Sequence, residues 1–190
     1  FFSYFITKSF LRKSFNEKEK KLALLMAVYW LLVSQNKMKD SGFGTYYILD
    51  KWTSSYPETS GYIIPTLYNY IKYKPAKEEE IKKSITECAN WLVDIQKTSG
   101  GWQSYYIVHD CPEVVFNTGQ ILRGLIIAFQ ITKTEKYLTS IKKACDWLIE
   151  IQEEDGSWTK MASMKQPRVY DAYVAHPLLM VYEITKNEKY

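Results

Sequence analysis

A chain of 190 residues, 46% hydrophobic and 24% charged, can bury the core of one globular domain, and this composition excludes a disordered chain. Its net charge of +4 comes from 22 Lys and 3 Arg interleaved with acidic residues, which indicates a solvated surface and no nucleic-acid partner. Cys88, Cys111 and Cys145 show no paired spacing, which favours buried, reduced thiols and a cytoplasmic protein without structural zinc.

The first strongly apolar run, Leu22 to Val33, is too short to span a bilayer and lacks a signal-peptide cleavage pattern. We therefore expect no membrane span. The run is better explained as a helix of the first of several internal repeats.

Those repeats are marked by the pattern Trp-Leu-x-x-x-Gln. It occurs at 30–35, 91–96 and 147–152, at intervals of 61 and 56 residues. Each copy is followed by a glycine turn that an aromatic residue closes, at Phe43, Trp102 and Trp158. Three copies of so long a pattern indicate a repeat architecture.

A second pattern opens an apolar helix between these copies, at 61–67, 119–125 and 173–179. Each unit therefore contains two helices. The helix over about 119–131 is apolar on nearly all faces, which is typical of an inner helix, whereas that over about 135–152 has one charged face and is typical of an outer one. The link recurs as Ile-Thr-Lys-x-Glu-Lys-Tyr at 131–137 and 184–190.

The repeats predict one domain over 1–190, divided at about 20–56, 57–112 and 113–168, with a further partial repeat over 169–190. We interpret the chain as part of a longer protein or an incomplete ring. An open edge of such a ring would expose apolar surface, so a homo-oligomer formed through that edge is one expectation.

The Trp-Leu-x-x-x-Gln, Asp-Gly-Ser-Trp and Asn-Thr-Gly-Gln segments resemble the α/α toroid superfamily of six-hairpin glycosidases, uronyl epimerases and lyases, and terpene cyclases. This resemblance implies an all-α fold of helical hairpins. Segments 116–120 and 169–173 most resemble bacterial proteins that act on polysaccharides, including glucuronyl C5-epimerase-like domains. The aspartate-rich acid motif of terpene cyclases is missing, which makes cyclase chemistry an outside alternative.

The resemblance places the functional site at the starts of the inner helices and the loops before them. The segments concerned are 56–62, 109–110, 117–123 and 168–176, which hold both histidines and two of the three arginines. The expected substrate-binding residues are Tyr62, Trp102, His109, Asn117, Gln120, Arg123, Arg168, Tyr173 and His176.

Arginine and aromatic residues in one loop set suit a sugar acid, because a guanidinium pairs with a carboxylate through two hydrogen bonds and rings stack on pyranose faces. Arg123 and Arg168 are the expected anchors, and Gln120 shares a helical face with Arg123. The alternative is that Arg123 is paired internally.

The expected catalytic residues are Glu58, Tyr170 and Asp171, which precede or open inner helices. Glycoside hydrolysis needs two carboxyl groups at one bond, whereas epimerisation or elimination needs groups that remove and deliver a proton. Each carboxylate has the alternative role of helix cap or dipole partner. Tyr62, Tyr170 and Tyr173 are candidate proton donors or stacking rings, with core packing as their alternative.

Both histidines have alternative interpretations. His109 would act as a base with Asp110 only if the chain folds back between them, and His176 has an interior position as its alternative role. No metal-ligand spacing or phosphate-binding glycine loop occurs, so we assign no metal and no cofactor.

Two classes of function follow. The first is a carbohydrate-active hydrolase, lyase or epimerase for a uronate-containing glycan, and the second is a noncatalytic repeat module that binds a glycan or protein partner.

Overall fold

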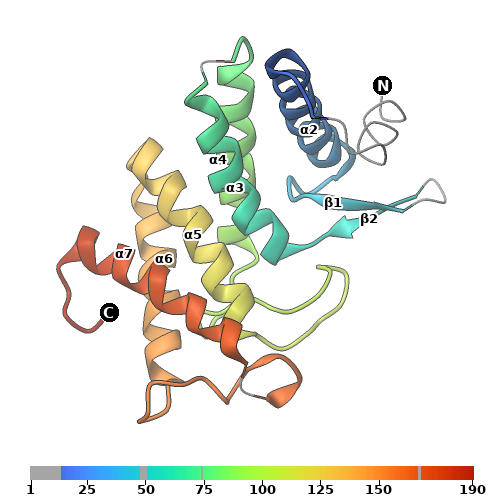
Figure 1. Cartoon of the computed structure of the whole chain (residues 1–190). Helices are drawn as coiled ribbons and strands as arrows, with labels where there is room; N and C mark the ends of the chain where they lie inside the picture. Colours follow the sequence, from blue (N-terminus) through green and yellow to red (C-terminus); the bar gives the residue numbers. More distant parts are fainter. Residues whose placement is uncertain (1–13, 48–50, 74, 167) are drawn as a thin grey trace.

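The computed structural model describes residues 14–47, 51–73, 75–166 and 168–190. These residues are mostly helical, which confirms the all-α prediction (Figure 1). The helices are α2 (Glu17–Lys37), α3 (Pro57–Ile71), α4 (Glu78–Asp94), α5 (Val115–Thr132), α6 (Glu135–Glu150) and α7 (Ala175–Thr185), with short 3-10 helices η1 (Ser163–Lys165) and η2 (Val169–Val174).

Helix α2 contains the apolar run Leu22–Val33 and begins at a capping box. The Asn16 side chain accepts a hydrogen bond from the Glu19 backbone at 2.9 Å, and the Glu19 carboxylate accepts one from the Asn16 backbone at 2.9 Å. None of the described helices is both long enough and apolar enough to cross a membrane.

The repeat pattern did not predict the antiparallel pair β1 (Gly44–Tyr47) and β2 (Lys51–Ser55) between α2 and α3. Thr45 and Thr53 bond across the pair, because the Thr45 backbone N–H donates to Thr53 Oγ1 at 3.0 Å. Trp30 of α2 contacts the rings of Tyr46 and Trp52 at centroid distances of 5.5 and 5.4 Å. β-branched and aromatic side chains favour strands, and here a ring of α2 supports them.

Helices α3 and α4 form one hairpin and α5 and α6 another, with α7 packed against α5 and α6 (Figure 1). The helix expected over about 119–131 is α5, and it is buried along most of its length. It approaches α3 closely at Gly61 and Gly124, where a Cβ on Gly124 would collide with the Gly61 carbonyl oxygen. Glycine at both positions therefore sets the distance between the two inner helices.

The glutamines of the first two Trp-Leu-x-x-x-Gln motifs each join their own turn to the next outer helix. Gln96 Nε2 donates to the carbonyls of Gly100 at 2.7 Å and Ser140 at 3.0 Å, and Ser140 Oγ donates to Gln96 Oε1 at 2.8 Å. Gln35 makes the same set of bonds with Ser41 and Ser84. We call this arrangement the glutamine latch; it connects α2 to α4 and α4 to α6.

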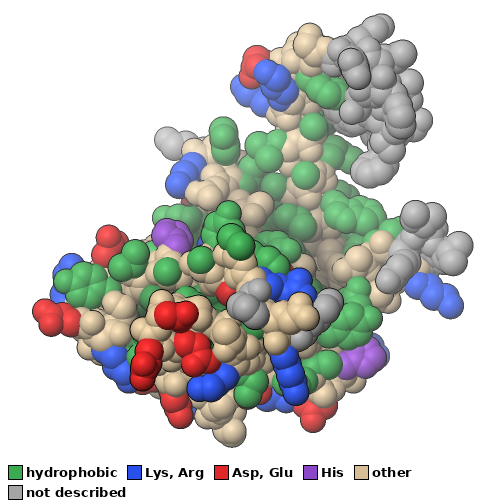
Figure 2. Space-filling view, turned by 60° about the horizontal axis from the view of Figure 1, so that its bottom comes forward, with side chains coloured by type: hydrophobic (Ala, Val, Ile, Leu, Met, Phe, Trp, Pro, Cys, Tyr) green, Lys and Arg blue, Asp and Glu red, His purple; other side chains and the backbone are tan. Residues whose placement is uncertain are grey.

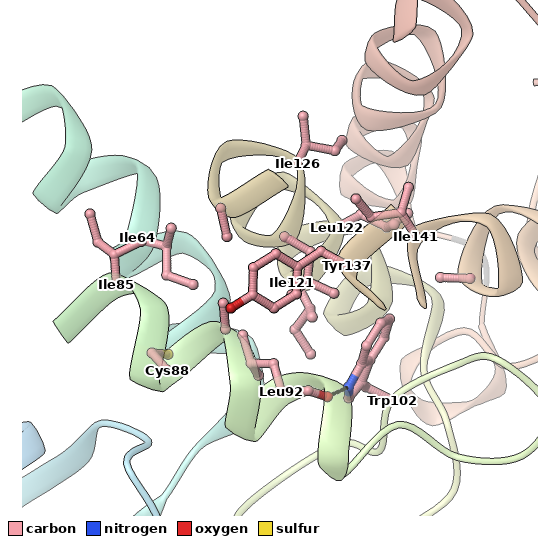
Figure 3. Packing of buried hydrophobic residues seen from close by; sticks show 14 of the residues in the cluster. Ile64, Ile85, Cys88, Leu92, Trp102, Ile121, Leu122, Ile126, Tyr137 and Ile141 are labelled. Carbon is pink, nitrogen blue, oxygen red and sulfur yellow. Dashed lines mark hydrogen bonds between the residues drawn. The ribbon is translucent and has the colours of Figure 1, made fainter. Parts of the chain in front are cut away.

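The aromatic residue that closes each turn belongs to the core. Trp102 is completely buried, and its indole N–H donates to the Leu92 carbonyl at 2.7 Å (Figure 3). Trp158 donates in the same way to the Leu148 carbonyl at 2.9 Å. These bonds satisfy the indole donor inside an apolar environment, so the turns are held against the ends of the outer helices.

Acidic and basic side chains lie interspersed over the face shown in Figure 2. Five of the salt bridges join residues three or four positions apart on helices, such as Lys82 with Glu78 at 2.7 Å. Such exposed pairs contribute little to stability, so the folded state depends on the core and on the latches.

Candidate active site

A cavity of about 340 Å³ lies where α3, α5 and η2 begin, a volume within the range of small-molecule sites. Its lining comes from four separate segments of the chain. The lining residues are Tyr56, Glu58, Ser104, Phe116, Asn117, Ser163, Tyr170 and Tyr173. We call it the Tyr56 cavity.

The start of α5 holds the two loops that border this cavity. The Val114 N–H donates to the Trp102 carbonyl at 3.0 Å, and the Val115 N–H donates to the Met161 carbonyl at 3.0 Å. One bond fixes the loop that carries Ser104, and the other fixes the loop that carries Ser163. Residues remote in sequence are thereby brought to one place.

Both loops contain non-glycine residues in the left-handed region of backbone conformation. Tyr105 has φ 65°, Met161 φ 57° and Lys165 φ 54°. Such conformations cost free energy and occur preferentially at binding and catalytic sites. Three of the six described non-glycine residues with a positive φ thus lie in the two bordering loops, and the others are Ser41 and the helix C-caps Lys133 and Lys186.

The carboxyl group of the cavity is that of Glu58, in the first turn of α3. Burial raises the pKa of Glu58 above its ordinary value, and a hydrogen bond with the Tyr56 side chain offsets part of this increase. Burial and then the Glu58 charge raise the pKa of Tyr56, whose side chain also bonds with Asn117. Glu58 therefore keeps its proton to a higher pH than a solvated glutamate, beside a phenol that stays protonated.

Aromatic rings form the η2 side of the cavity. Tyr170 packs edge-on against Phe116 at a centroid distance of 4.8 Å, whereas Tyr173 is 66% exposed and available to a ligand. The Arg168 guanidinium lies 5.7 Å from the Tyr170 ring centre, and its Nε donates to the Ser163 carbonyl at 3.3 Å. Since Tyr170 and Ser163 both line the cavity, the Arg168 charge lies at its edge. Arg168 forms no salt bridge within the described ranges.

The cavity brings together four of the residues expected from the sequence, namely Glu58, Asn117, Tyr170 and Tyr173. Tyr62 lies one helical turn beyond Glu58 and is 37% exposed. Burial and the Glu58 charge raise its pKa, so it is close to the site without lining the cavity.

Three predicted substrate contacts are corrected by the packing. Trp102 cannot stack on a ligand because its ring is completely buried and its N–H is bonded to Leu92. Arg123 Nη1 donates to Gln120 Oε1 at 2.9 Å, and neither residue lines the Tyr56 cavity. The internal pairing left open for Arg123 is therefore what the fold contains.

The histidine predictions also change. Asp110 pairs with Lys97 at 2.5 Å, whereas the exposed His109 ring contacts Tyr105 at a centroid distance of 5.0 Å. The condition set for a pairing of His109 with Asp110 is not met, because the Asp110 carboxylate pairs with Lys97. His176 is exposed in the first turn of α7, so an interior role is wrong as well, and it does not line the cavity.

Asp171 does not line the cavity and is only 2% exposed. Neither carboxylate oxygen has a well-formed hydrogen bond within the described part of the chain. Burial raises the pKa of Asp171, and the backbone and charge of Arg168 offset part of this increase.

Tyr56, Ser104, Phe116 and Ser163 were missed as site residues. Tyr56 is the first residue of segment 56–62 and Phe116 the first residue of segment 116–120, so the sequence singled out both segments without choosing these two residues. Ser104 and Ser163 lie in loops with no motif, and only the bonds to the start of α5 bring these loops to the cavity.

Two cysteines, Cys88 and Cys145, are buried free thiols, whereas Cys111 is partly exposed. Burial raises the pKa of Cys145 to about 12. Within the residues that the structure describes, no group of three or more His, Cys, Asp or Glu side chains could hold a metal ion.

Comparison with known proteins finds one distant similarity in sequence. The chain is 27% identical over 118 residues to protostadienol synthase A of Arthroderma gypseum. The match covers 60% of this chain, and the chain spans 15% of the length of that protein. No family model and no solved structure matches the chain. The matched protein is a terpene cyclase, one of the groups included in the resemblance noted from the sequence, and a polysaccharide-acting relative is not confirmed.

Proposed function

We propose that the Tyr56 cavity binds a sugar ring of a uronate-containing glycan and that Glu58 donates a proton to it. The observation that carries this proposal is a carboxyl group with a raised pKa inside a lining rich in hydroxyl and amide groups. Phenols, serine hydroxyls and the Asn117 amide can exchange hydrogen bonds with sugar hydroxyls, and exposed rings can stack on a pyranose face.

Within carbohydrate chemistry, the lining favours a lyase or epimerase over a hydrolase. Hydrolysis by the usual route needs two carboxyl groups flanking one bond. Among the described residues that line the cavity, Glu58 alone carries a carboxyl group, and Asp171 is buried outside the lining. Elimination or epimerisation at C5 needs one group that accepts the C5 proton and another that delivers a proton, to the leaving oxygen or to the opposite face of C5. We give the first role to Tyr170 and the second to Glu58. Arg168 at the edge would bind the uronate carboxylate.

Ligand-induced thermal shift tests the binding part of the proposal. The panel consists of uronate oligosaccharides, neutral oligosaccharides and isoprenoid diphosphates, because a ligand at a hundredfold excess over its Kd stabilises the folded state by about 2.7 kcal/mol. We expect a shift with uronates that Arg168→Ala abolishes. Arg123→Ala is the matched control and should keep the shift, since Arg123 lies outside the cavity. A shift lost in both variants, or in neither, would contradict the assigned carboxylate site.

Turnover of a uronate glycan tests Glu58. Glu58→Gln should bind the glycan yet lose at least tenfold in turnover, since a general acid contributes on the order of a hundredfold or more. Glu150→Gln, on the exposed face of α6, is the control. Because the pKa of Glu58 is raised, turnover should fall as the pH rises through that pKa and the donor loses its proton. Undiminished turnover in Glu58→Gln would remove the residue from the mechanism.

The similarity to protostadienol synthase A favours a second candidate, a terpene cyclase-like protein that uses Glu58 as its acid. A thermal shift with isoprenoid diphosphates alone would favour it. Binding of a glycan without turnover would instead favour the noncatalytic module.

A further inference from the structure

The two interfaces between successive outer helices, α2 with α4 and α4 with α6, can be compared position by position. Both contain a glutamine latch. Their Trp-Leu-x-x-x-Gln motifs fix the register, with 61 residues from Trp30 to Trp91 and 56 from Trp91 to Trp147. Any further difference between the two interfaces therefore comes from the side chains at matching positions.

At the interface of α4 with α6, the ring of Tyr137 fills the space between the helices. Tyr137 is 1% exposed, and its hydroxyl points toward α4 (Figure 3). The hydroxyl donates to Asn90 Oδ1 at 2.6 Å and lies 3.4 Å from the Thr86 carbonyl. Tyr190, 53 residues after Tyr137, makes an equivalent contact: its hydroxyl donates to Asp146 Oδ1 at 3.0 Å.

At the interface of α2 with α4, the register places Ile81 where Tyr137 stands, Tyr29 where Asn90 stands and Leu25 where Thr86 stands. All three line a cavity of about 550 Å³. Isoleucine is shorter than tyrosine and has no ring, and the Tyr29 side chain opposite is 54% exposed, so the space that a phenol fills at one interface remains open at the other. Met26 and Tyr70 add further apolar wall.

One end of this cavity is polar. Lys77, at the start of α4, lines it with a side chain that is 59% exposed, and pairs with Glu80 at 2.8 Å outside the lining. Lys77 is close enough to Tyr29 for the two groups to interact electrostatically. A ligand would thus meet apolar walls in the cavity and a cation with a phenol at its edge.

We propose that this cavity, between α2 and α4, binds a small molecule with an apolar ring system and one acidic group. The ring takes the place that the Tyr137 ring occupies at the next interface, and the acidic group lies against Lys77. The volume is within the range of ligand sites, and buried apolar area would supply most of the affinity. This site is separate from the Tyr56 cavity, with which it shares no lining residue.

The test uses 8-anilinonaphthalene-1-sulfonate, a fluorescent ring system with an acidic group, on the whole chain. We expect saturable binding with one probe per chain, weakened at least tenfold in Ile81→Tyr, which restores the ring of the other interface. Met26→Trp fills the same space from α2, at a position 39% exposed, and should act alike even if Ile81→Tyr folds poorly. Lys83→Tyr adds a ring to the solvent face of α4, where the side chain is 74% exposed, and should leave binding unchanged.

Lys77→Gln removes the positive charge at the edge of the cavity and should weaken binding of the probe several-fold. A crystal structure of the wild-type complex should show the naphthalene ring beside Ile81 and Tyr29. Absence of saturable binding, equal affinity in the filled variants, or a probe located elsewhere in the crystal would each overturn the proposal.

Discussion

Removing one glutamine latch should destabilise the protein in proportion to the hydrogen bonds that the latch makes. Gln96→Met keeps the length of the side chain but removes three bonds, to Gly100 and twice to Ser140. At about 1 kcal/mol net for each bond, the free energy of unfolding should fall by about 3 kcal/mol. For a chain of this size, that corresponds to a Tm lower by about 6–12 °C.

Gln152→Met provides a matched comparison within the same motif. Gln152 makes one of these bonds, from its Nε2 to the Gly156 carbonyl at 3.0 Å, and has no described outer helix beyond it. Its loss should cost about 1 kcal/mol, or about 2–4 °C in Tm. Both variants would be compared with wild type by thermal unfolding followed by far-ultraviolet circular dichroism. Equal losses in the two variants would refute the assignment of stability to the bonds between outer helices.

Two further perturbations test the packing of the inner helices. Gly124→Ala should lower the free energy of unfolding by about 2 kcal/mol, because the new methyl group forces α5 away from the Gly61 carbonyl; an unchanged denaturant midpoint would contradict that close approach. Asp171→Asn should remove a pH dependence of stability. Since burial raises the pKa of Asp171 above 3.8, wild type loses stability as the pH rises through that raised pKa, and urea midpoints across this range should fall less in the variant than in wild type, with Glu58 contributing the same dependence to both.

The location of a candidate site residue could be predicted best where it follows from the helix that carries the residue. Glu58 belongs to the first turn of α3 and Asn117 to that of α5, so each lies at the end of an inner helix that the repeat pattern marks. Tyr170 and Tyr173 follow from the same reasoning at η2. Residues whose position depends on how a loop folds back, such as Ser104 and Ser163, gave no sequence signal.

The amino-acid sequence by itself determined the helical class, the three Trp-Leu-x-x-x-Gln motifs and the ends of α5 and α6 to within a few residues. It did so because the helical period of apolar residues and the turn glycines are local properties of the chain. Periodicity also identified the apolar run of α2, although it did not indicate that Leu24, Leu25 and Trp30 remain 40–48% exposed.

Tertiary structure decided what each polar group faces. Whether Arg123 meets a ligand or Gln120, and whether Asp110 meets His109 or Lys97, depends on distances between side chains that no motif encodes. The β1–β2 pair depends likewise on the ring of Trp30, which approaches only in the folded chain. The cavity at Ile81 arises for the same physical reason, because isoleucine replaces a buried ring there and the ring that faces it, Tyr29, is 54% exposed and leaves the volume open.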